Sequence, residues 1–334
     1  TYGGSIELTG ESPPAMIAQT EIQTYVSDAL ATGKLGVPDP EAIYTLVYPQ
    51  STTITQLNPV TTLLPPVKSC ASFTGYHDSV LVAAGDAGAS AKTRFAFAVI
   101  PTCAAAVSSL TAPMTHEWVE AATDPAPTFP SGGVILPSGG PEAAFFATDK
   151  DHTVWSLLGG GEAGDLCSAN GPSVVVASPE LGFAVQRTWS NIAARASHDP
   201  CVPHIAGAAY FAAAPVLDQT VSFDTSFTGP VTSKGVIIPT EESRTIEVDL
   251  FSDAALDGPI TVKADDLLNA YYGSSGLAKT LDFAWDRTEG VNGEKLHLTV
   301  TVTTSSFLGG AHAFVITASR GSRRQVWPGL VVEK

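Results

Sequence analysis

The chain has 334 residues, of which 44% are hydrophobic and 15% charged, and this composition is typical of a folded protein with room for two domains. Acidic residues outnumber basic ones by 33 to 17, which gives a formal net charge of −16. This balance argues against nucleic acid and against an anionic membrane surface as partners, because both bind basic faces. No apolar run approaches the roughly 18 residues of a membrane-spanning helix, so we expect no membrane span.

The first part of the chain alternates helical and strand-like segments. Apolar residues recur at helical spacing over residues 15–33. The segments "AIYTLVYP" and "TRFAFAVIP" are rich in β-branched and aromatic residues and predict buried strands. Residues 103–122 again show helical spacing, with Val107 and Trp118 among the candidate core positions. Pro113 lies within that run, so we expect a short helix or turn before it and the main helix to begin near it.

The rest of the chain divides into loops and short strands. Residues 126–175 are rich in Gly and Pro and predict long loops. Further on, short alternating strands are separated by turns of Gly, Pro and Asp, and Asn292-Gly293 ahead of such a strand predicts a β-hairpin. We therefore expect an α+β domain over residues 1–214 and an all-β immunoglobulin-like sandwich over residues 215–334.

Four cysteines, an even number, occur without any C-x-x-C pair. We predict the disulfides Cys70–Cys103 and Cys167–Cys201, which would place the chain in an oxidising, extracellular compartment. The low lysine content and the abundance of Thr, Ser, Ala and Gly also favour a secreted chain. The alternative is four buried thiols in a cytosolic protein.

The segment "HEWVEAATDP" carries the residues on which a functional hypothesis depends. His116 and Glu120 stand four residues apart, so on a helix both side chains can point toward one ion. Glu117 lies beside them, as in the H-E-x-x-H helix of zinc peptidases, where the glutamate accepts a proton from the metal-bound water. Zinc accepts carboxylate oxygen, so Glu120 can take the place of the second histidine. The alternative is an ordinary surface helix with solvated glutamates.

Three further acidic residues and one histidine complete the predicted site. Asp124 follows the expected helix end, where a carboxylate is unfavourable against the helix dipole unless a cation or a donor faces it. The segment "GGGEAGDLC" places Glu162 and Asp165 in a loop beside a disulfide, where a third ligand could come from. His77, in "TGYHD", is a ligand, a donor that polarises a substrate carbonyl, or a structural residue.

The ordered motifs "GYHD", "FAVIPTC", "HEWVEAATDP", "GEAGDLC" and "VQRTWSN" resemble those of secreted proteins related to the plant exordium, or phosphate-induced, family. Bacterial relatives of that family are described as secreted metallopeptidase-like proteins. The resemblance spans residues 15–201 and rests on the order of the motifs. This chain differs from the family pattern at Trp118 and Ala163, neither of which would bind a metal. The resemblance supports a metal site more strongly than it supports proteolysis.

The sequence thus predicts a zincin-like N-terminal domain in a secreted, zinc-dependent endopeptidase. Zinc would be held by His116, Glu120 and Glu162. Asp124 or Asp165 would contact these ligands without binding the ion. Glu117 would act as the general base that takes a proton from the water attacking a peptide carbonyl. The competing hypothesis is a non-catalytic secreted or cell-surface binding protein whose carboxylates hold calcium. The sequence makes no prediction of the oligomeric state.

Overall fold

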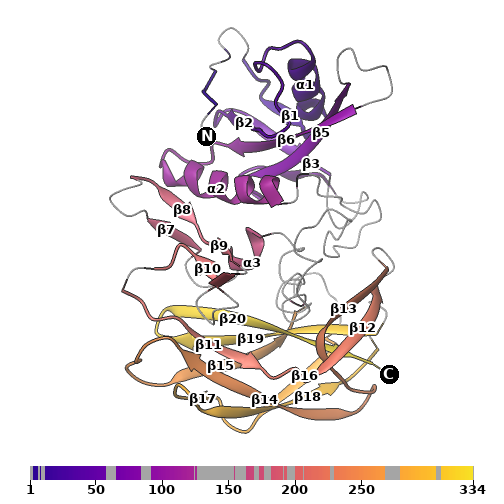
Figure 1. Cartoon of the computed structure of the whole chain (residues 1–334), viewed down its shortest axis with the longest axis vertical. Helices are drawn as coiled ribbons and strands as arrows, with labels where there is room; N and C mark the ends of the chain where they lie inside the picture. The colour runs from indigo at the N-terminus through magenta and orange to yellow at the C-terminus, as the bar shows by residue number, and fades with distance from the viewer. Residues whose placement is uncertain are drawn as a thin grey trace. The chain divides into compact units, whose positions relative to one another are not determined.

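The structure is a computed structural model that describes residues 3–6, 8, 12–57, 65–83, 92–123, 125, 154, 163–168, 173–176, 182–190, 192–193, 200–205, 207–225, 229–267, 279–305 and 310–333. The chain divides into two compact units (Figure 1). The first consists of Thr1–Glu142 and Val174–Gln186, and the second of Ala143–Ser173 and Arg187–Lys334. Among the described residues, no helix is both long and apolar enough to cross a membrane.

The predicted fold class, an α+β zincin-like domain followed by an all-β immunoglobulin-like sandwich, is wrong. In the part of the chain that the structure describes, strands dominate and are spread over six sheets of two to six strands each. Only α1 (Gln19–Ala31) and α2 (Ser108–Thr123) are longer than about one helical turn there, since α3 (Asp165–Ser168) has four residues. The physical reason is that most apolar runs are short and rich in β-branched or aromatic residues, which favour strands.

The first unit is built on a three-stranded sheet with the order β2-β6-β5. β2 (Ile43–Tyr48) pairs in parallel with β6 (Lys92–Pro101), and β5 (Tyr76–Ala83) pairs with β6 in the antiparallel direction. The remaining strands of the unit form two smaller sheets: β1 (Met16–Ala18), β3 (Thr53–Gln56) and β4 (Val67–Lys68) in one, β7 (Val174–Val176) and β8 (Ala184–Gln186) in the other.

Helices α1 and α2 cover opposite faces of the β2-β6-β5 sheet (Figure 1). On one face, Tyr76 of β5 and Phe97 of β6 form an apolar core with Ile22 of α1. Because successive residues of a strand point to opposite faces, His77 is directed toward α2. Ala98 of β6 lies opposite His77 in the ladder, and its small side chain leaves room for the helix.

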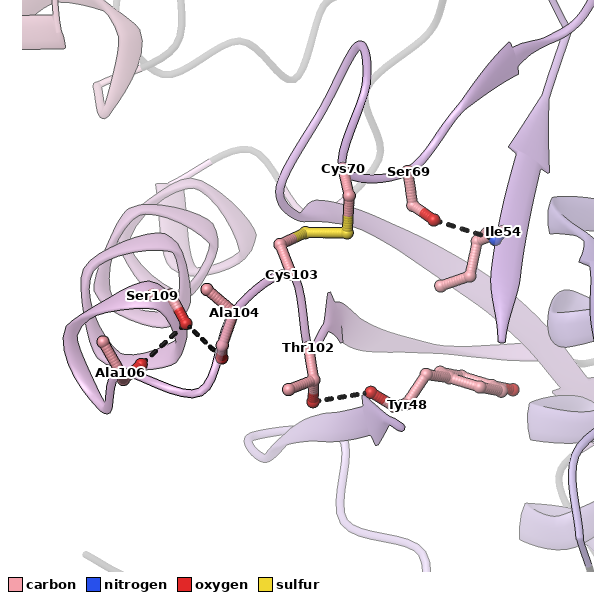
Figure 2. Close-up of a disulfide and its surroundings, with 9 residues drawn as sticks. All are labelled: Tyr48, Ile54, Ser69, Cys70, Thr102, Cys103, Ala104, Ala106 and Ser109. Atoms are coloured by element: carbon pink, nitrogen blue, oxygen red, sulfur yellow. Dashed lines mark hydrogen bonds between the residues drawn. A yellow bond between two sulfur atoms is a disulfide. The ribbon is translucent and has the colours of Figure 1, made fainter. Parts of the chain in front are cut away.

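The disulfide Cys70–Cys103 confirms the first predicted pairing (Figure 2). It connects the segment ahead of β5 with the segment ahead of α2. Beside it, Thr102 is fixed to β2, because its backbone N–H and its hydroxyl both donate to the Tyr48 carbonyl, at 2.9 and 2.8 Å. The bridge therefore ties together the approaches to the two elements that carry the candidate site.

The second unit contains two larger sheets around one apolar core, in which Phe211, Val248 and Phe314 are fully buried. The sheet orders are β11-β14-β18-β16 and β12-β13-β20-β19-β15-β17. The strands are β11 (Phe211–Pro215), β12 (Gln219–Thr225), β13 (Gly229–Ile237), β14 (Ser243–Ser252), β15 (Ile260–Asp266), β16 (Leu281–Trp285), β17 (Glu289–Gly290), β18 (Lys295–Val302), β19 (Ala311–Arg320) and β20 (Arg323–Val332). The boundary predicted between residues 214 and 215 lies inside β11.

Two features of the second unit bear on the sequence predictions. The disulfide Cys167–Cys201 joins α3 to β10 (Cys201–Val202), which pairs with β9 (Thr188–Trp189), so the second predicted bridge is also confirmed. The hairpin predicted at Asn292-Gly293 is not formed. Gly293 does occupy a turn, with φ of 84°, but β17 pairs with β15 while β18 pairs with β14 and β16. The turn therefore carries the chain from one sheet to the other.

Candidate metal centre

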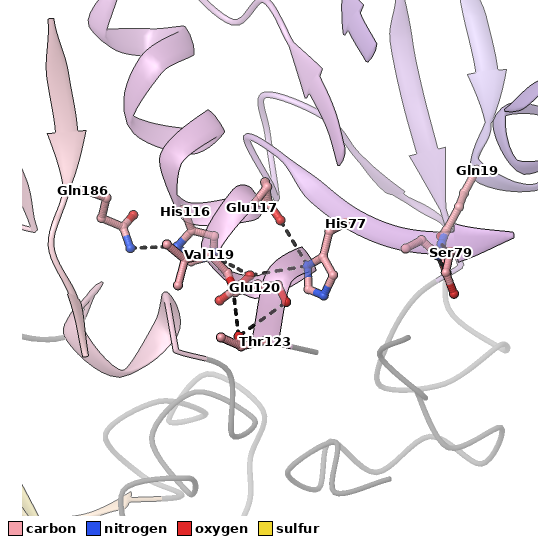
Figure 3. Close-up of polar contacts among 10 residues, drawn as sticks. Gln19, His77, Ser79, His116, Glu117, Val119, Glu120, Thr123 and Gln186 are labelled. Carbon is pink, nitrogen blue, oxygen red and sulfur yellow. Dashed lines mark hydrogen bonds and ion pairs between the residues drawn. The ribbon is translucent and has the colours of Figure 1, made fainter. Parts of the chain in front are cut away.

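Four ionisable side chains of the first unit lie together between β5 and α2 (Figure 3). β5 supplies His77, and the C-terminal half of α2 supplies His116, Glu117 and Glu120. His77 Nδ1 lies 3.4 Å from Glu117 Oε2 and 3.5 Å from Glu120 Oε2. His116 Nε2 lies 3.0 Å from the same oxygen of Glu120. One carboxylate oxygen is therefore in contact with two imidazoles.

The two glutamates are buried, whereas the large apolar side chains of the same region are not. Glu117 is 5% exposed and Glu120 only 1%, while Val107 is 65% and Trp118 42% exposed. The prediction that Val107 and Trp118 belong to the core is therefore wrong. Burying a carboxylate costs free energy unless it is paired or bound to a cation. A helix that buries two of them in place of its tryptophan points to a role for the carboxylates other than packing.

Their surroundings shift the pKa values of the two glutamates in opposite directions. Burial raises the pKa of Glu117, and the hydrogen bond with His77 and the charge of His116 offset this only in part. Burial also raises the pKa of Glu120, but the hydrogen bonds and charges of His116 and His77 outweigh it and hold that pKa well below its usual range. Glu120 is thus the carboxylate suited to bind a cation, and Glu117 the one suited to accept a proton.

Gly75 makes room for the Glu117 side chain. A Cβ atom at position 75 would lie 2.7 Å from Glu117 Oε1 and 2.8 Å from its Cγ. Cβ atoms in proteins essentially never come closer than 3.0 Å to another heavy atom in this way. Any side chain at this position would therefore displace the carboxylate. The "GYHD" motif contributes to the cluster twice, through the missing side chain of its glycine and through the imidazole of His77.

The predicted site residues are brought together in part. His77 joins the three residues of α2, as described above, and Asp165 begins α3 in the second unit. Asp124 and Glu162 lie outside the described residues. Gln186, which the sequence did not mark as a site residue, also contacts the cluster, and its Nε2 lies 2.7 Å from His116 Nδ1. The only signal for it was its place in the "VQRTWSN" motif.

The donor atoms of the cluster suit zinc better than calcium. His116 Nε2 and Glu120 Oε2 are 3.0 Å apart, a hydrogen-bond distance, and a small outward movement would give the roughly 3.4 Å expected between two ligand atoms of a tetrahedral zinc with bonds of about 2.0–2.2 Å. The ligand atoms of His77, Glu117 and Glu120 also lie within 4.8 Å of one another. Imidazole nitrogen with carboxylate oxygen is a donor set that zinc accepts, whereas calcium prefers six to eight oxygens.

Comparison with known proteins adds no assignment. No family model and no curated protein matches this sequence. Domains 4 and 5 of the S-layer protein SbsC align with 35% of this chain at 16% identity and a TM-score of 0.20, and the match spans 46% of that structure, less than half of its length. The titin M3 domain aligns with 30% of this chain at 10% identity and a TM-score of 0.18, over 88% of that domain. Structural similarity at TM-scores this low supports no conclusion about function.

Proposed function

We propose that this protein is a secreted, zinc-dependent hydrolase that cleaves peptide bonds at the centre between β5 and α2. The observation that carries the proposal is the burial of Glu117 and Glu120 beside two histidines. Two carboxylates held this close together repel each other and lose hydration, and a bound cation offsets both costs. The two disulfides support the secreted assignment, because disulfides persist in oxidising compartments.

Each residue of the cluster has its own task in this proposal. His116 and Glu120, one helical turn apart, bind the ion through Nε2 and a carboxylate oxygen. Glu117, whose pKa is raised by burial, accepts a proton from the attacking water. His77 Nδ1, 3.4 Å from Glu117, orients that carboxylate. Zinc, when bound, supplies the Lewis acidity that peptide hydrolysis requires.

The proposal is tested by measuring zinc content and peptide cleavage in the same set of variants. Glu117→Gln should hold zinc like the wild type but lose hydrolysis by about 10²–10⁴-fold, because the amide cannot accept the proton. Glu120→Ala should lose zinc and activity together. Glu41→Ala, which removes an exposed carboxylate of the same unit, should change neither. If the zinc-loaded wild type cleaves no peptide in a broad substrate screen, the peptidase function is wrong.

A further inference from the structure

Gln186, the last residue of β8, contacts the imidazole of His116 on the side away from Glu120 (Figure 3). Gln186 Nε2 lies 2.7 Å from His116 Nδ1, and His116 Nε2 lies 3.0 Å from Glu120 Oε2. Both ring nitrogens are thus engaged, one by an amide and one by a carboxylate. The amide is therefore placed to influence which of the two nitrogens carries the proton.

The position of Gln186 is set by its backbone. Its N–H donates to Thr115 Oγ1 at 3.0 Å, and the Thr115 hydroxyl in turn donates to the Ala112 carbonyl at 2.8 Å. Gln186 also pairs with Val174 in the β7–β8 ladder. Since Thr115 directly precedes His116, the strand is attached to α2 at the point where the amide has to meet the imidazole.

A glutamine fits both proton arrangements that His116 needs. A neutral imidazole has one donor nitrogen and one acceptor nitrogen. When Nε2–H donates to Glu120, Nδ1 is the acceptor and the amide NH₂ is its matching partner. When Nε2 binds an ion, the proton is on Nδ1 and the amide carbonyl is the matching partner. A half-turn of the terminal amide exchanges these two groups.

We propose that Gln186 is a positioning residue that fixes the proton of His116, stabilising the Nε2–H form in the metal-free protein and the Nδ1–H form when the ion is bound. This inference rests on the proposed function, because it requires that His116 binds the ion through Nε2. Partners of this kind behind a metal-bound histidine contribute about 10–100-fold to metal affinity. The β7–β8 pair is then part of the metal centre, although it is distant from α2 in the sequence.

The test compares the zinc affinity of Gln186→Glu and Gln186→Met with that of the wild type, by competition with a chelating dye. A carboxylate can only accept a hydrogen bond and so matches the metal-bound form, and Gln186→Glu should bind zinc at least as tightly as the wild type. A thioether matches neither form well, and Gln186→Met should bind about 10–100-fold more weakly. Gln56→Met, at a half-buried glutamine of β3 in the same unit, is the matched control and should bind like the wild type.

A second readout is the tautomer of His116 in the metal-free protein, measured by ¹⁵N NMR of histidine-labelled samples. We expect the neutral Nε2–H form in the wild type and, in Gln186→Glu, a proton on Nδ1 as well, because a carboxylate then faces each ring nitrogen. A purely structural role of Gln186 would leave this distribution unchanged and would lower zinc affinity equally in both variants, and either result overturns the inference.

The zinc measurements separate two outcomes: a wrong role for Gln186 and a wrong proposed function. If the wild type binds zinc and Gln186→Met binds it equally tightly, Gln186 does not position His116 while the metal centre stands. If the wild type binds no zinc, the proposed function is wrong. The NMR measurement then still decides the role of Gln186, because a metal-free wild type with His116 in the Nδ1–H form contradicts the pairing with the amide NH₂.

Discussion

Helices α1 and α2 cover opposite faces of one sheet, yet they bury opposite kinds of side chain. The buried residues of α1 are all apolar, with Ile22 and Leu30 almost completely enclosed. The buried residues of α2 are two alanines and the two glutamates, Glu117 and Glu120. One face of the sheet is therefore an apolar core, and the other holds buried carboxylates that depend on the histidines beside them to offset the cost of burial. The contrast teaches that burial alone does not mark a residue as part of the stabilising core.

The largest effect on stability is expected on the α1 face. Ile22→Ala should lower the free energy of unfolding by about 2–5 kcal/mol, because it leaves a cavity among tightly packed apolar side chains. Denaturant titration of the metal-free protein measures this change, and zinc should still bind to the folded fraction. A loss below about 1 kcal/mol would show that this face does not form the stabilising core.

The next largest effect is a loss of hydrolytic activity, expected where Gly75 lies against the Glu117 side chain. Gly75→Ala introduces a Cβ that displaces the Glu117 carboxylate, and a misplacement of about 1 Å can reduce hydrolysis about 10²-fold. Zinc content should remain that of the wild type, because Glu117 is not a ligand in the proposed mechanism. Gly3→Ala is the control, since a Cβ there meets no atom within 4 Å. Full activity of Gly75→Ala in a peptide cleavage assay would show that the position of Glu117 is unimportant.

The smallest effect is expected at the tryptophan of α2. Trp118 is 42% exposed, and its Nε1–H donates to Thr45 Oγ1 at 2.7 Å. Trp118→Ala should therefore cost about 1 kcal/mol, close to the value of one hydrogen bond. Thermal unfolding of this variant next to Ile22→Ala compares the two helices directly. A loss of about 3–5 kcal/mol would instead assign Trp118 to the core, as the sequence pattern predicted.

Features that depend on local periodicity could be predicted from the sequence. The helical spacing within residues 15–33 corresponds to α1, and the runs "AIYTLVYP" and "TRFAFAVIP" correspond to β2 and β6. Both disulfides were predicted correctly from four cysteines. For the helix and the two strands the signal lies in the segment itself, so no knowledge of the packing was needed, whereas the disulfide pairing was one of the three that four cysteines allow.

The inward face of α2 could not be predicted, because it depends on contacts across the fold. Which side of the helix is buried is decided by β5 and β6, where the alternation of the strands places Ala98 and His77 beneath the carboxylates. The helix also begins at Ser108, ahead of Pro113, and not near the proline as predicted. The contact with Gln186 joins residues far apart in the sequence, and no local pattern reports it.

The central claim is that Glu117 and Glu120 are buried because an ion is bound beside them. The most direct test is the melting temperature of the metal-free wild type, Glu117→Gln and Glu120→Ala, each with and without excess zinc. Zinc at 100 times its Kd should stabilise the wild type and Glu117→Gln by about 2.7 kcal/mol and so raise their melting temperatures, while the melting temperature of Glu120→Ala should not change. A wild type that zinc does not stabilise, or an equal rise in Glu120→Ala, would contradict the claim.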